Sequence, residues 1–202
     1  MALKYNGTWN AMLAQWYALD EKGYLTANSV NVSLEKAQSE FSDEHAAMYI
    51  DGSWSMAGIV EKNPDLKFGM FPMPANKSNG EIFVSAAIGT TWTINKRTPN
   101  IEAAKLYLAF WSKPENLQIW TKSQDAFITL DGIKSQAAPE LSEISQLIFS
   151  GKTFPFLDQG WEQSYAVQTE LMNSAQGVYL KAISQEQMLK KMDAAWDAAV
   201  SQ

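Results

Sequence analysis

The sequence predicts an α/β protein in which helices predominate over a small sheet. Several segments carry apolar residues at helical spacing and are bounded by capping residues. Short apolar runs between turn residues alternate with these segments and are typical of strands. The chain has 202 residues, 46% of them hydrophobic, which is enough to build one large domain or two small ones.

The N-terminal helix has signals at both ends. Thr8 is a residue type that caps helices, the apolar residues that follow it recur at helical spacing, and Gly23 can end the helix in the left-handed conformation. Ser33 begins a shorter helix. We predict the second and third helices over about residues 33–40 and 54–62, the third being stopped by Pro64.

Two segments have the sequence pattern of strands, one between the second and third helices and one after the third helix. AAMYI, residues 46–50, is expected to be a brief buried strand that ends at the turn Asp51-Gly52. EIFVSAAI, residues 81–88, has a second strand pattern. Prolines and a glycine keep LKFGMFPMP, residues 66–74, extended, and WTINK, residues 92–96, is a further extended stretch.

The second half of the chain is predicted to be mostly helical. Residues 99–123 form two helices that meet at a corner, where Ser112 and Pro114 restart the chain. The first of these helices carries an apolar stripe formed by Ile101, Ala104, Leu108 and Trp111. Later helices are expected over about residues 139–149, 161–174 and 185–200. Ser184 and Gln187 form a capping box at the last of them.

Composition narrows the range of partners. A net charge of −6 and scattered lysines and arginines argue against nucleic acid and anionic membranes, so a neutral or weakly charged ligand fits better. The absence of cysteine excludes disulfides and thiolate sites, and one histidine, His45, cannot form a multi-histidine metal cluster. We therefore predict no cofactor and no bound metal.

Seven of the eight tryptophans fall into two groups. Trp54 and Trp161 each follow a turn, in IDGSW and LDQGW, and stand where a helix begins. The apolar C–H face of a pyranose stacks on an indole, so two such plates would suit a sugar, although a tryptophan on a turn can also close the end of a core. Polar residues flank both plates: Asp51, Ser53, Asp158, Gln159 and Glu162. Five further tryptophans lie on helical stripes and are interpreted as core residues: Trp9, Trp16, Trp111, Trp120 and Trp196.

The segment FSDEHAAMYIDGSW, residues 41–54, resembles a known signature, F-x-x-G-x-A-A-M-x-x-x-G-x-W. This signature belongs to family 1 of the extracellular solute-binding proteins, the maltodextrin-binding-protein-like receptors that deliver sugars to ABC importers. The resemblance continues through FGMFPMP, through residues 89–118 and through residues 161–177. SDEH is a departure, because the family usually has a turn with glycine before the alanine pair.

This resemblance implies a periplasmic-binding-protein-like fold of type II, of which the chain would be a C-terminal lobe fragment. Residues 1–95 and 129–202 would build that lobe, and residues 96–128 would be a helical segment of the N-terminal lobe. The receptor would be extracytoplasmic, either periplasmic or lipid-anchored at the cell surface, and MALKYNGTWN does not have the pattern of a signal segment. Its partners would be a saccharide and the membrane permease of an ABC importer, and the fragment is expected to self-associate.

The resemblance also assigns roles to single residues. Trp54 falls on the family's sugar-stacking tryptophan, and Trp161 falls where a second aromatic plate often lies. Gly89 and Thr90 match a loop whose backbone approaches the ligand closely. The predicted ligand-binding residues are thus Trp54, Trp161, Asp51, Ser53, Gly89, Thr90 and Asp158.

Two other classes of function remain open at this point. Asp158 and Glu162, four residues apart beside Trp161, could serve a glycoside hydrolase, but acidic residues are also common at helix starts because they favour the helix dipole. The apolar stripes could alternatively belong to a helical module that binds another protein. A serine hydrolase is disfavoured because His45 is the only possible base and the sequence contains no G-x-S-x-G.

Overall fold

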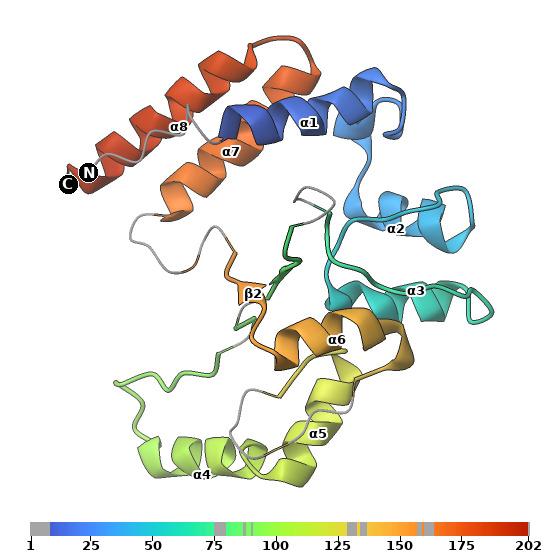
Figure 1. Ribbon diagram of the computed structural model, residues 1–202. Coiled ribbons are helices and arrows are strands. Elements are labelled where there is room, and N and C mark those ends of the chain that lie inside the picture. Colours follow the sequence, from blue (N-terminus) through green and yellow to red (C-terminus); the bar gives the residue numbers. More distant parts are fainter. Residues whose placement is uncertain are drawn as a thin grey trace. The chain divides into compact units, whose positions relative to one another are not determined.

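The structure, a computed structural model, describes residues 9–74, 80–86, 88–89, 91–128, 133, 137–156, 159 and 164–201 (Figure 1). It is rich in helices and contains one small sheet, in agreement with the predicted predominance of helix. The chain divides into two compact units. One comprises residues 1–33 and 155–202, and the other residues 34–154.

The first unit is a set of helices around one core. Helices α7 (Ser164–Tyr179) and α8 (Gln185–Val200) pack against each other as a hairpin, and α1 (Trp9–Glu21) contacts α8 (Figure 1). A short 3₁₀ helix, η1, spans Ser29–Asn31. The buried side chains come from all three α-helices: Leu13, Tyr17, Val167, Met188, Leu189 and Met192. Trp9, Trp16 and Trp196 pack against this core, which confirms the interpretation of these three tryptophans.

Tyr17 contributes a hydroxyl group to this core. Its hydroxyl donates to the carbonyl oxygen of Ala175 at 3.2 Å, and its ring lies 4.7 Å from that of Tyr179. Burial, and secondarily the neighbouring Tyr179, raises the pKa of Tyr17 to about 12. The hydroxyl therefore stays protonated and keeps its role as a donor inside the helical core.

Local sequence signals define several helix ends as predicted. The Ser184 hydroxyl accepts from the Gln187 backbone N–H at 3.1 Å, while the Gln187 side chain accepts from the Ser184 N–H at 2.8 Å, so the capping box is confirmed. Gly23 adopts a positive φ of 70° after α1, and the N–H groups of Gly23 and Tyr24 bond back to Asp20 and Leu19. Glycine is favoured there because a Cβ is strained in the left-handed region. Thr8, the expected N-cap, lies outside the described residues.

The second unit holds the remaining elements and a smaller core. Its helices are α2 (Leu34–Ser42), η2 (Ser53–Ser55), α3 (Met56–Lys62), α4 (Ile101–Trp111), α5 (Pro114–Ser123), η3 (Pro139–Leu141) and α6 (Ser142–Phe149). Its buried apolar cluster consists of Met56, Leu141 and Ile144, with Phe68, Met70, Val84 and Phe127 packed around them, and Ile59 of α3 is buried as well. The helices thus occur close to the predicted positions.

The strands match the predictions less well. β1 (Val84–Ser85) pairs in parallel with β2 (Thr153–Phe154). Among the described residues of the predicted strand 81–88, only these two residues of β1 form a strand, and β2 was not predicted. The prediction of a buried strand over residues 46–50 is wrong: this segment is irregular, and Met48 and Ile50 are exposed. An apolar run becomes a strand only where another strand lies beside it, and within the described part of the chain none pairs with this one.

Helices α4 (Ile101–Trp111) and α5 (Pro114–Ser123) form the predicted pair, but the predicted burial of the α4 stripe is wrong. Within α4, all of whose residues are described, none is buried. Trp111 and Trp120 are half-buried, and each lies next to Trp92 in the preceding extended segment, at ring distances of 5.6 and 5.7 Å. The stripe is therefore partly covered by another aromatic side chain rather than enclosed in a core.

No helix in the described part of the chain combines the length and the apolar character that a membrane span needs.

Candidate functional site

The predicted sugar plate, Trp54, lies on a tight turn. The turn, residues 49–55, connects the irregular segment 46–50 to α3, and Trp54 is the middle residue of η2. Its side chain is 59% exposed, unlike those of the tryptophans that pack on the helical core. The side chain of Trp54 is therefore largely exposed on a turn, and its role as a sugar plate stays a prediction.

Asp51 organises the first part of this turn. Its Oδ2 accepts a hydrogen bond from the Tyr49 hydroxyl at 2.8 Å, and its Oδ1 accepts one from the Gly52 N–H, also at 2.8 Å. Burial, followed by the hydrogen bond to the Asp51 carboxylate, raises the pKa of Tyr49 above its ordinary value. Asp51 was predicted as a ligand contact, and the structure gives both of its oxygens a role within the turn.

Aromatic contacts join the turn to the core of its unit. The Tyr49 ring stacks on Phe41 of α2 with centroids 6.1 Å apart. Phe41 in turn meets the edge of Phe68 at 6.0 Å, and Phe68 packs on the buried cluster around Met56. The base of the Trp54 turn is thereby fixed by side chains that belong to three separate segments.

Helix α2 also holds the far end of the turn. The Gln38 amide Nε2 donates to the carbonyl oxygen of Ser55 at 3.0 Å. Gly58 on α3 leaves room for this amide, because a Cβ there would lie only 2.8 Å from Gln38 Nε2. Both ends of the turn are therefore supported, and we infer that its backbone is well defined.

The cavity beside the turn is too small for a sugar. It has a volume of about 40 Å³ and is lined by Tyr49, Asp51, Phe68 and their neighbours. Small-molecule pockets usually measure at least ~300 Å³. The turn therefore offers a ligand an exposed surface rather than an enclosed pocket.

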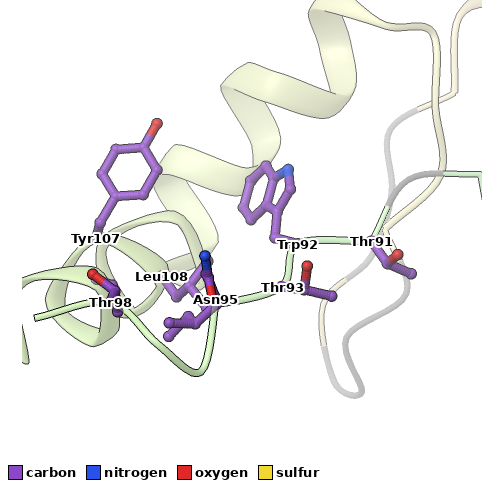
Figure 2. A pocket seen from close by; sticks show the side chains of 9 residues that line it. Thr91, Trp92, Thr93, Asn95, Thr98, Tyr107 and Leu108 are labelled. Carbon is purple, nitrogen blue, oxygen red and sulfur yellow. The ribbon is translucent and has the colours of Figure 1, made fainter. Parts of the chain in front are cut away.

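A larger cavity of about 390 Å³ lies beside α4 in the same unit (Figure 2). The extended segment 91–95 forms one wall, and Tyr107 and Leu108 of α4 form the other. Thr91, Thr93, Asn95 and Thr98 supply uncharged polar groups there, and Trp92 and Tyr107 supply aromatic rings. Trp92 had been assigned neither a site role nor a core role from the sequence. Its position directly after Gly89-Thr90-Thr91 was the signal that could have drawn attention to it.

The structure brings together three of the seven predicted ligand residues: Asp51, Ser53 and Trp54 share the turn. Gly89 is exposed on a different segment, and a Cβ added to it would meet no atom of the described chain within 4 Å. Thr90, Asp158 and Trp161 lie outside the described residues, as does Glu162, the second carboxylate of the glycoside hydrolase alternative. The ligand-binding roles of all seven residues, and the alternative role of Glu162, therefore stay predictions.

Two comparisons with known proteins bear on this site. A family model for bacterial extracellular solute-binding proteins matches residues 3–118, which include the Trp54 turn and α4. A relative described as a multiple sugar-binding protein of Streptococcus mutans serotype c is 23% identical over 143 residues, which are 71% of this chain and 34% of that protein. The chain thus spans about a third of the length of the curated relative that it matches.

Proposed function

The chain belongs to the bacterial extracellular solute-binding protein family, and from this premise we propose that it is part of a carbohydrate receptor of an ABC sugar importer. The observation that carries the proposal is the exposed indole of Trp54 on a turn held by Asp51 and Gln38. An indole face stacks on the C–H face of a sugar ring, and a fixed turn presents that face without further ordering. The name of the Streptococcus mutans relative supports a sugar as the ligand class.

The proposed mode of binding is closure of two lobes over the saccharide, with no bond-making chemistry. Trp54 and Trp161 act as stacking plates, and Ser53, Asp51, Asp158 and the loop at Gly89 and Thr90 contact the hydroxyls. In this proposal the fold is of the type II periplasmic-binding-protein class. Residues 1–95 and 129–202 belong to the C-terminal lobe, residues 96–128 belong to the other lobe, and a membrane permease receives the closed receptor.

Saccharide titration of the full-length gene product tests this function. Maltodextrins of increasing length are added while intrinsic tryptophan fluorescence and the heat of binding are recorded, and reducing ends are assayed in parallel. We expect saturable binding without release of reducing sugar. Release of reducing sugar would support the glycoside hydrolase alternative, and a flat response to maltodextrins and other neutral oligosaccharides would contradict a carbohydrate receptor.

We also propose that the 202-residue chain self-associates through α4 and α5. Leu106, Tyr107 and Phe110 of α4 and Ile119 of α5 are exposed large apolar side chains. An apolar surface of this kind on two adjacent helices favours association with another chain.

Light scattering at micromolar concentration measures the assembly state of the 202-residue chain. We expect a dimer or larger assembly for the parent and a shift toward monomer for Leu106→Glu. Met172→Glu is the matched control, because Met172 is a similarly exposed apolar side chain on α7 and its replacement leaves α4 and α5 intact. A monomeric parent, or equal effects of the two variants, would contradict association through this surface.

A further inference from the structure

Gly52 lies directly beneath the indole of Trp54. A Cβ built on Gly52 would collide with Cη2, Cζ3 and Cε3 of Trp54, three atoms of the six-membered ring. The ring therefore occupies the space that any side chain at position 52 would need. The backbone of Gly52 is extended, with φ of −100° and ψ of 175°, a conformation that every residue adopts easily. It is thus the contact with the indole, and not the backbone conformation, that requires glycine.

The backbone of Gly52 is held on both sides and has little freedom to yield. Its N–H donates to Asp51 Oδ1 at 2.8 Å. Its carbonyl oxygen accepts from the Ser55 N–H at 3.1 Å and from the Ser55 hydroxyl at 2.8 Å. Moving Gly52 away from the indole would stretch these three hydrogen bonds, whereas the Trp54 side chain, which is more than half exposed, can turn into solvent. A side chain at position 52 would therefore displace the indole rather than the turn.

We propose that Gly52 is a positioning residue for Trp54, because the missing Cβ lets the indole lie flat on the turn in one orientation. The turn covers one face of the indole at Gly52. A ring that is already oriented loses less rotamer freedom when a ligand stacks on it, so the arrangement favours binding. The part of this inference that concerns a ligand rests on the proposed function, but the orientation of the indole by Gly52 does not.

The orientation is tested without any ligand by ¹⁹F NMR of the chain labelled with 5-fluorotryptophan. The resonance that disappears in Trp54→Phe identifies Trp54. We expect Gly52→Ala to shift this resonance strongly and to leave those of the tryptophans on the helical core in place. Gly69→Ala is the control in the same unit: its Cβ would lie 3.9 Å from the Glu140 carbonyl oxygen, an ordinary contact, so the Trp54 resonance should not move. An unmoved Trp54 resonance in Gly52→Ala would overturn the proposal.

A double-mutant cycle on the full-length gene product tests the consequence for binding. With a maltodextrin as the probe, we expect Gly52→Ala to weaken affinity by about 2- to 10-fold, the scale of one side chain that must be ordered on binding. In the Trp54→Ala background the same substitution should have no further effect, because no indole remains to be displaced. Equal losses in the two backgrounds would show that Gly52 acts through the backbone and would overturn the proposal.

Two further outcomes are also decisive. If Gly52→Ala does not fold alone, folding of the Gly52→Ala/Trp54→Ala double variant supports the contact, and failure of both variants contradicts it. If no maltodextrin binds to the parent, that result counts against the proposed function, and the shift of the Trp54 resonance still decides the role of Gly52.

Discussion

Replacing Leu189 with alanine is expected to lower the free energy of unfolding by ~2–5 kcal/mol. Leu189 is completely buried, with 0% exposure, in the core that α1, α7 and α8 share. The substitution removes apolar contacts and leaves a cavity among side chains from three helices, which cannot all move inward to fill it. Because whole domains are usually stable by only ~5–15 kcal/mol, this is the largest effect that we expect from a single change.

Urea unfolding followed by circular dichroism measures this effect as a shift of the midpoint at constant slope. Leu180→Ala is the matched control, because Leu180 lies in the same unit but is 63% exposed, and its truncation should change stability by less than ~0.5 kcal/mol. If Leu189→Ala and Leu180→Ala unfold at the same urea concentration, then α8 does not pack on α1 and α7 as described.

Helices were predictable from the sequence because their signals are local. The capping box of Ser184 and Gln187 and the glycine at position 23 specify helix ends through atoms a few residues apart. The same reasoning separated Trp9, Trp16 and Trp196, which pack on the core, from Trp54, which is exposed. A helical stripe indicates which face can be buried, but not whether another segment covers it. For this reason α4 forms as predicted while its stripe is not buried.

Strands were predicted less well because pairing is not local. Residues 46–50 have a strand-like composition, but no neighbouring strand within the described chain pairs with them. Thr153 and Phe154 form β2 because β1 lies beside them, and two residues are too few to show the alternating pattern of a strand. The hydrogen-bond partner, rather than the propensity of the segment, decided both cases.

In the candidate site, as in the fold, local features could be predicted from the sequence and contacts between side chains could not. The position of Trp54 after a turn was visible in the sequence, and the structure places Asp51 and Ser53 in the same turn. The contact between Gly52 and the indole could not be predicted, because it depends on the rotamer of Trp54 and on the hydrogen bonds that hold the turn. The link from Tyr49 through Phe41 to Phe68 joins segments distant in sequence and likewise has no local signal.

Replacing Trp54 with alanine in the full-length gene product is expected to weaken saccharide binding by more than ~1 kcal/mol, or about fivefold or more in affinity. The variant loses the apolar face that would stack on the sugar ring. The turn should survive, because the hydrogen bonds from Tyr49 and Gly52 to Asp51 do not involve the indole. The melting temperature should therefore change little, as for other substitutions of largely exposed side chains.

Calorimetric titration with maltodextrins and a thermal unfolding scan, performed on the same preparations, separate these two effects. Trp54→Phe keeps a smaller aromatic face and should lose less affinity than Trp54→Ala. Tyr24→Ala removes an aromatic side chain of comparable exposure from the other unit and should leave affinity unchanged. These measurements distinguish a first class of side chain, which contributes by contacting the ligand, from a second class, which contributes by packing within the protein. Unchanged affinity together with a large fall in the melting temperature would place Trp54 in the second class, and the exposed indole could then no longer support a sugar site at this turn.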